Sequence, residues 1–185
     1  MRNGCAWQLP RARPARNLPA PPRAGLERRL HWVASMTTET VPRSILVPID
    51  FSEPAEAALD FAVALAAKLD ATVHILNVVD MQGYHFADLG ASLTSEMIDK
   101  IMTGNQTALD RIANARRGVA RIGEVLLRTG DPRDIIDRVA TELKVDLIAM
   151  GTHGRRGFKR MMLGSVAEAV VRTAPCPVLT VRPPQ

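Results

Sequence analysis

Three glycines and a serine near the end of the chain have the types and spacing expected of a phosphate-binding loop. Gly151 and Gly154 follow an apolar run, and after nine further residues Gly164 and Ser165 stand at the start of an apolar-periodic helix. The first amides of a helix have no partner within it, and the helix dipole places partial positive charge there. Glycine lets the backbone approach a phosphate and take a positive φ where a turn requires one. The pattern predicts an anion site; the alternative is a purely structural turn.

Four cations lie between these glycines, and they are Arg155, Arg156, Lys159 and Arg160. They stand where a triphosphate would carry its charge, although the same side chains could simply form a solvated loop. No GxxxxGK[ST] sequence occurs anywhere, so the mechanism of the P-loop ATPases is not available. The chain offers no Ser/His/Asp or Cys/His set and no metal-ligand spacing. We therefore assign no catalytic residue and no metal site.

The positive charge of the chain is concentrated at its beginning. The 185 residues carry a net charge of +5, but residues 1–35 hold seven arginines and one acid, so the remainder sums to −1. Charge therefore gives no support to a domain that binds specific nucleic acids. The two cysteines suggest no disulfide framework and favour a reducing compartment, so we expect a cytoplasmic protein. No apolar run approaches the ~20 residues of a transmembrane helix.

Residues 1–40 are rich in proline, arginine and alanine, and their apolar residues have no period. The prolines at positions 10, 14, 19, 21 and 22 forbid a long helix, so we expect disorder. An organelle transit peptide would also be Arg-rich, but it should form an amphipathic helix, which these prolines break. Alternatively, Met36 is the true start and the upstream residues are a mis-assigned extension. We expect one folded domain over residues 41–185.

The rest of the chain alternates between strand and helix patterns. The expected strands are Ser44–Asp50, Thr72–Val79, Ile122–Arg128, Val145–Met150 and Pro177–Val181, and segments with helical apolar spacing separate them. Pro48 cannot donate to a central ladder, so we place it at the C-terminal end of the first strand. Continuous apolar strands are typical of a sheet covered on both faces. The fold class expected is α/β, an open five-stranded, mostly parallel sheet with helices on both faces.

Two further expectations concern the helices and the strand ends. The helix expected over Thr94–Arg117 is weakened by Gly104, and the residues expected on its apolar side are Met97, Ile101, Ala108, Leu109 and Ile112. Ligands of open parallel sheets bind beyond the carboxyl ends of the strands, at the switch point. Asp50, Val78 and Gly151 all stand at such ends. We therefore expect these three residues to converge.

The glycine motif, together with ILVPIDFSEPAEAAL at the first strand and APCPVLTVR at the last, resembles the universal stress protein (Usp) family over residues 42–183. The resemblance implies a Rossmann-like fold, similar to the adenine nucleotide alpha hydrolases, that is usually dimeric. The complete motif implies the ATP-binding branch, with Asp50 near the ribose and Val78 paired to adenine through its backbone. The full set of binding residues implied is Pro48, Asp50, Val78, Met150, Gly151, His153, Gly154, Gly164, Ser165 and Val166.

We therefore expect an ATP-binding regulator of stress or signalling with little or no turnover, in which Mg²⁺ accompanies the nucleotide. Nucleotide occupancy would change the binding of a regulatory protein partner or the dimer state. One alternative is a slow ATPase of the same superfamily, in which His153 or Asp50 assists. Another is a nucleotide-free interaction module. In the ATP-binding regulator and in the nucleotide-free module, we expect the last strand, Pro177–Val181, to pair edge to edge with that of a second copy.

Overall fold

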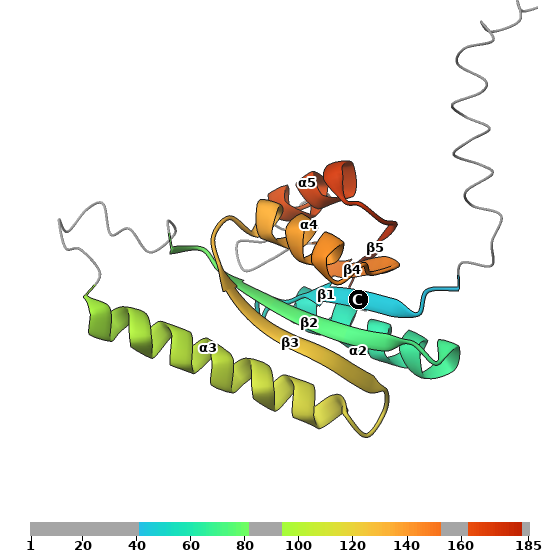
Figure 1. Cartoon of the computed structure of the whole chain (residues 1–185), viewed down its shortest axis with the longest axis horizontal. Helices are drawn as coiled ribbons and strands as arrows, with labels where there is room; N and C mark the ends of the chain where they lie inside the picture. Colours follow the sequence, from blue (N-terminus) through green and yellow to red (C-terminus); the bar gives the residue numbers. More distant parts are fainter. Residues whose placement is uncertain (1–40, 82–93, 153–162, 183–185) are drawn as a thin grey trace, which may run out of the picture. The chain divides into compact units, whose positions relative to one another are not determined.

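The computed structural model describes residues 41–81, 94–152 and 163–182, and the fold is that of these segments. The elements in chain order are β1 (Ser44–Pro48), α2 (Glu53–Leu69), β2 (Thr72–Val79), α3 (Ser95–Arg116), β3 (Arg121–Thr129), α4 (Pro132–Glu142), β4 (Leu147–Gly151), α5 (Ser165–Thr173) and β5 (Val178–Val181). The strands form one sheet in the order β3-β2-β1-β4-β5, and every neighbouring pair is parallel (Figure 1). The predicted α/β fold is confirmed. The disorder expected for residues 1–40 and the start at Met36 concern residues outside these segments.

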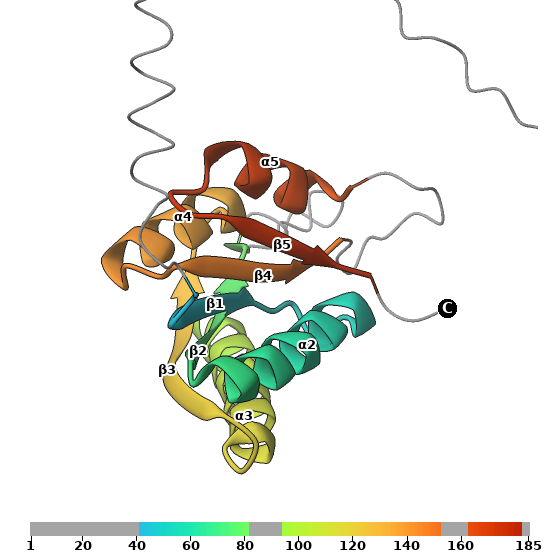
Figure 2. The ribbon, with the colours of Figure 1, turned by 90° about the vertical axis from the view of Figure 1, so that its right-hand side faces the viewer.

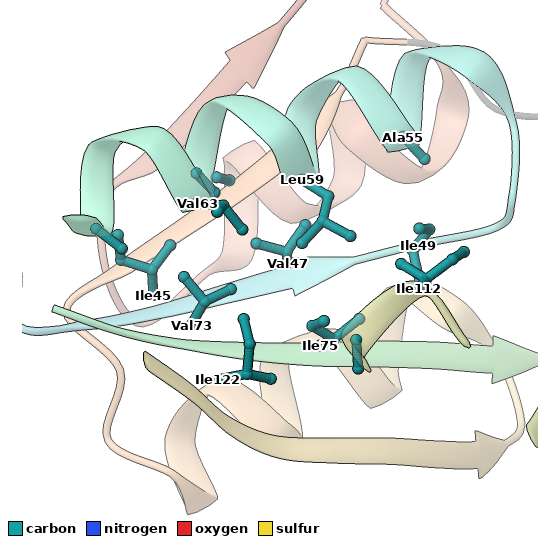
Figure 3. Close-up of a cluster of buried hydrophobic side chains, with 14 of the residues drawn as sticks. Ile45, Val47, Ile49, Ala55, Leu59, Val63, Val73, Ile75, Ile112 and Ile122 are labelled. Atoms are coloured by element: carbon teal, nitrogen blue, oxygen red, sulfur yellow. The ribbon is translucent and has the colours of Figure 1, made fainter. Parts of the chain in front are cut away.

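Helices cover both faces of the sheet, with α2 and α3 on one side and α4 and α5 on the other (Figure 2). Alternate residues of a strand point to opposite faces, so each inner strand contributes side chains to the hydrophobic cores on both faces of the sheet. In β1, Ile45 and Val47 pack under α2, as Figure 3 shows, whereas Leu46 packs with α4 and α5. All three side chains are fully buried. The strands are therefore unbroken apolar runs because both faces of the sheet are covered, as expected.

The ladder between β1 and β4 ends early because of Pro48. The recorded register pairs Ile45 with Leu147 and Leu46 with Ile148, and it goes no further. Pro48 is the last residue of β1, as predicted, and it has no N–H to continue a ladder. After β1 the chain builds outward through β2 and β3, and it then returns to place β4 and β5 on the other side. The switch point therefore lies between β1 and β4, where their carboxyl ends separate.

The expected apolar side of α3 packs against the sheet only in the second half of the helix. Leu109 and Ile112 are buried, but Met97 is 44% exposed and Ile101 and Ala108 are half-buried. The apolar side therefore lies against the core only in the second half of the helix. Helical spacing identifies which side of a helix is apolar but not how much of its length lies over the strands. Figure 1 shows the beginning of α3 reaching past the sheet.

A bulge in β3 is filled by the side chain of His74. The register pairs Val73 with Ile122 and then Ile75 with Val125, so Gly123 and Glu124 stand together opposite His74. The Glu124 N–H donates to Nδ1 of His74 at 3.0 Å. A Cβ on Gly123 would lie 2.8 Å from the imidazole Cε1. The ring therefore replaces a ladder hydrogen bond that the bulge removes, and only glycine leaves space for it.

Acidification should destabilise the fold through His74. Burial lowers the pKa of His74 from its ordinary value of 6.5, and the nearby Glu124 carboxylate partly opposes this shift. Because the unfolded histidine takes up its proton first, the free energy of unfolding should fall as the pH drops below about 6.5, until the folded pKa is passed. The protonated ring would also carry a hydrogen on Nδ1, the atom that accepts from Glu124. Urea midpoints measured between pH 7.5 and pH 5 check this expectation.

The matched variant is His74→Asn, which keeps an acceptor near the position of Nδ1 but does not titrate. Its midpoints should depend less on pH than those of the unchanged protein, because the other histidines are common to both. Identical pH dependence in the two proteins would contradict the role given to His74.

Candidate functional site

The two ends of the glycine motif meet at the carboxyl end of β4. The Gly164 N–H donates to the carbonyl of Thr152 at 2.8 Å, and the Thr152 N–H donates to the carbonyl of Val181 in β5 at 3.1 Å. These bonds fix the start of α5 beside the last residues of β4, where Met150 and Gly151 are buried. His153, Gly154 and the four cations that follow lie outside the described segments. The structure therefore places the beginning and the end of the motif together.

The first turn of α5 presents backbone donors that the helix does not use. Ser165 is the first helical residue, and the first bond within the helix runs from the Glu168 N–H to the carbonyl of Gly164 at 2.8 Å. The amides of Ser165, Val166 and Ala167 therefore have no partner inside α5. The N-cap, Gly164, has no side chain to satisfy one of them. With the positive end of the helix dipole, this turn can bind an anion.

Gly151 is needed for space and not for backbone conformation. Gly164 has φ −62°, and among the described glycines only Gly130 has a positive φ. Neither Gly151 nor Gly164 therefore supplies a positive φ. A Cβ on Gly151 would lie 2.8 Å from the carbonyl carbon and oxygen of Pro54. The missing side chain at 151 lets the first turn of α2 approach the end of β4.

Asp50 lies in the turn that joins β1 to α2. Its Oδ1 accepts from the N–H of Ser52 at 3.1 Å and from the Ser52 hydroxyl at 2.5 Å. Ser52 is the N-cap of α2, and its hydroxyl donates to Asp50 but accepts no cap hydrogen bond from the helix. Phe51 between them has φ 63°, an uncommon conformation for a bulky residue. This turn holds a half-buried carboxylate over the carboxyl end of β1.

Val78 lies past the end of the ladder between β1 and β2. The Ile49 N–H donates to the carbonyl of Leu76 at 2.8 Å, which is the last bond of that ladder. Peptide groups of alternate residues in a parallel strand face the same neighbour, so those of Val78 face the side of β1. The Gly130 N–H donates to Val79 on the opposite side, which fits this alternation. The backbone of Val78 therefore faces the turn that carries Asp50.

Sequence reasoning missed two buried polar residues at this edge, Asn77 and Thr152. Asn77 is 3% exposed, and its Nδ2 donates to the carbonyl of Ile49 at 2.7 Å. Thr152 is 5% exposed and takes part in the bonds that close the motif. The available signal for Asn77 was one amide inside the apolar run TVHILNVV, where a polar side chain must find a partner.

Charge is divided along this edge of the sheet. Asp131 after β3 caps α4, and hydrogen bonds from Arg133 lower the pKa of its carboxyl group. Arg133 has its pKa raised, mainly by the hydrogen bond to Asp131 and to a smaller extent by Asp134 and Asp80. On the β2–β3 side, Asp80, Asp131 and Asp134 lie near Arg133, and Asp131 caps the start of α4. On the β4–α5 side, the start of α5 has no side-chain cap, although Glu168 lies in its first turn. An anionic group fits the β4–α5 side.

A separate hollow of about 300 Å³ lies at the amino ends of the strands, where α2 and α3 end. Asp70 and Arg121, two of its lining residues, form an ion pair with each other at 3.2 Å. Both helices direct their carbonyl ends there, which disfavours an anion. Within the described segments, no group of three or more His, Cys, Asp or Glu residues could hold a metal ion. None of the helices described has the length and apolarity needed to cross a membrane.

Gly151→Ala should destabilise the protein, because the new Cβ would meet the backbone of Pro54, which cannot move aside alone. We expect a loss of about 1–3 kcal/mol in the free energy of unfolding, as for other overpacked sites. Urea unfolding measures it. Gly104→Ala in α3 is the control, since its Cβ would meet nothing within 4 Å. That variant should gain about 0.5–1 kcal/mol. Equal effects of the two substitutions would contradict the packing role of Gly151.

Comparison with known proteins agrees with this fold. The family model described as the universal stress protein family matches residues 42–182. A putative universal stress protein of Staphylococcus haemolyticus (strain JCSC1435) is 37% identical over 145 residues, which are 76% of this chain and 84% of that protein. A universal stress protein of Methanocaldococcus jannaschii is 36% identical over 149 residues, covering 80% of this chain and 86% of the relative.

Solved structures agree as well. The universal stress protein UspA of Lactobacillus plantarum superposes with a TM-score of 0.65 at 31% identity, covering 75% of this chain and 97% of that one. Two more distant structures share the fold. One is a universal stress protein in complex with cAMP, at 22% identity, TM-score 0.55 and coverage of 76% and 97%. The other is an Arabidopsis thaliana protein with AMP bound, at 18% identity, TM-score 0.52 and coverage of 77% and 93%. The chain therefore belongs to the universal stress protein family.

Proposed function

We propose that this protein binds ATP at the carboxyl ends of its strands, between β1, β2, β4 and α5. We further propose that it acts as a nucleotide-dependent regulator. The observation that carries the proposal is the bond from Gly164 to Thr152. It sets the unused amides of α5 beside the switch point, where ligands of such sheets bind. The distribution of carboxylates along the carboxyl ends of the strands supports an orientation of the nucleotide in which its phosphates lie toward α5.

Each part of the nucleotide has a matching group. The phosphates would take the amides of Ser165 and Val166, and the ribose would lie near the carboxylate of Asp50. The adenine would pair with the peptide groups of Val78. The remaining residues of the proposed site are Pro48, Met150 and Gly151 at the strand ends and His153, Gly154 and Gly164 in the motif. Mg²⁺ would be held mainly through the phosphates, as is usual for this ion.

Other proteins of this fold give support of a coarser kind, because two of them contain the adenine nucleotides cAMP and AMP. The choice of ATP rests on the complete glycine motif and on the four cations between its second and third glycines. Little or no turnover is proposed because the groups that face the site within the described segments are mostly peptide amides. The Oδ1 atom of Asp50 is already held by two hydrogen bonds from Ser52.

The last strand is the proposed contact between two copies of the chain. Within the described segments, β5 is at the edge of the sheet, pairs only with β4, and leaves all four of its residues half-buried. An unpaired strand edge is a template for a second strand. Because Val181 of β5 also accepts from Thr152, a dimer made here would adjoin the nucleotide site. Nucleotide occupancy could then alter dimerisation or the binding of a regulatory partner in the cytoplasm.

Ser165→Pro is the sharpest test of the phosphate site. Proline at the first helical position removes an amide that α5 does not use, and Gly164 with ψ 150° already has the conformation that precedes proline. The helix should stay folded while ATP loses one charged hydrogen bond, which corresponds to about 10–100-fold in affinity. Calorimetric titration with ATP and Mg²⁺ measures the dissociation constant. Far-ultraviolet circular dichroism confirms the helix.

Ser165→Ala is the matched control, because it removes the hydroxyl and keeps the amide. Its loss of affinity should be clearly smaller than that of Ser165→Pro. Equal affinity of the proline variant and the unchanged protein would exclude this amide as a phosphate ligand. Absence of binding by the folded, unchanged protein at millimolar ATP would exclude the proposed function itself.

A further inference from the structure

The ladder between β1 and β2 stops one bond before its regular pattern would allow. Because the Ile49 N–H donates to the carbonyl of Leu76, the next bond of a parallel ladder would run from the Val78 N–H to the carbonyl of Ile49. Among the described residues that bond is absent. The carbonyl of Ile49 instead accepts from Nδ2 of Asn77 at 2.7 Å. A side chain of β2 has taken the acceptor that its own backbone would use.

We propose that Asn77 is a positioning residue for the base of the nucleotide. By occupying the carbonyl of Ile49, its amide keeps the N–H of Val78 available for a ligand. The inference rests on the proposed nucleotide site and adds to it the feature that recognises the base. Asn77 itself is buried and acts through Val78.

The energetics of Asn77 agree with a role other than stability. Its side chain lies in the row of β2 residues that packs under α2 and α3, where its neighbours Val73 and Ile75 are fully buried. The Oδ1 atom of Asn77 is buried and has no hydrogen-bond partner among the described residues. An unsatisfied buried acceptor destabilises a protein, and an apolar residue at this position would avoid that cost. The side-chain amide of Asn77 therefore lowers the stability of the core, and stability does not explain why an amide stands at this position.

The open peptide of Val78 also defines the chemistry of the base. Its N–H can donate to a ring nitrogen, and its carbonyl can accept from an exocyclic amine. Adenine presents that pair at N1 and N6, and both contacts lie on one edge of the ring. Guanine presents a protonated N1 and a carbonyl, which would oppose the donor and acceptor of Val78. The proposal thus predicts a preference for adenine over guanine that depends on Asn77.

Asn77→Leu tests this role with a side chain of similar size that cannot hydrogen-bond. The carbonyl of Ile49 should then accept from the Val78 N–H, which closes the ladder and removes that donor from the site. ATP affinity should fall by about tenfold, the loss of one hydrogen bond. The melting temperature should stay the same or rise. 1-Deaza-ATP, which lacks the N1 acceptor, separates the explanations: the unchanged protein should bind it more weakly than ATP, whereas Asn77→Leu should bind the two alike.

Amide hydrogen exchange gives a readout that needs no nucleotide. In the unchanged protein without ligand, the Val78 N–H should exchange quickly relative to the other amides of β2. In Asn77→Leu it should be protected. Asn77→Val, which suits a strand, is the second variant if the leucine variant does not fold. Slow exchange at Val78 in the unliganded, unchanged protein would overturn the inference.

Ile75→Val is the control for general loosening of the core, since it lies on the same face of β2 and leaves the ladder end unchanged. It should lower the melting temperature and keep the ratio of ATP to 1-deaza-ATP affinity. If Asn77→Leu weakens both ligands equally, the positioning role is wrong although the nucleotide site stands. If the unchanged protein binds neither ligand, the proposed function fails, and the exchange rate of Val78 still decides whether Asn77 keeps its N–H open.

Discussion

The hydrogen bond from the Gly164 N–H to the carbonyl of Thr152 joins two parts of the molecule that the chain separates by eleven residues. Buried Ala167 and Val170 pack α5 against β4, and this bond fixes the first turn of the helix at the end of the strand. With it, the amides of the first helical turn stand at the carboxyl end of the sheet, beside the gap where β1 and β4 diverge. The proposed anion site, the proposed direction of the nucleotide and the proposed link to β5 through Thr152 all depend on this closure.

Close packing supplies the rigidity that such a closure needs. Gly151 lets the first turn of α2 lie against the end of β4, so the turn that carries Asp50 is fixed relative to the motif. Both faces of β1 are fully buried, which leaves the strand little freedom to shift. Two polar side chains then modify the ladders of β2. His74 fills the bulge in β3, and Asn77 takes the last acceptor of β1.

Much of this arrangement could be predicted from the sequence because it is local. The apolar runs located all five strands, and the first residue of α5 was predicted at Ser165. The position of Pro48 also followed from its missing N–H. The rest depends on register between distant strands. The bulge at His74 requires knowing that Val73 pairs with Ile122, and the role of Asn77 requires knowing which carbonyl lies within its reach.

Glycine conformation and helix packing were harder to predict for a related reason. A GxxG pattern does not tell whether glycine is there for a positive φ or for space, and for Gly151 the answer lies in the backbone of Pro54. The spacing in α3 identified an apolar side, but the sequence does not state where the sheet beneath it ends. The most direct measurement of the central claim is an NMR titration of the ¹⁵N-labelled chain with ATP and Mg²⁺. We expect saturable shifts of the Ser165, Val166 and Val78 amides. We expect no shift at Arg121, at the amino end of β3. Shifts confined to the amino ends of the strands, or no shifts at millimolar ATP, would contradict the account.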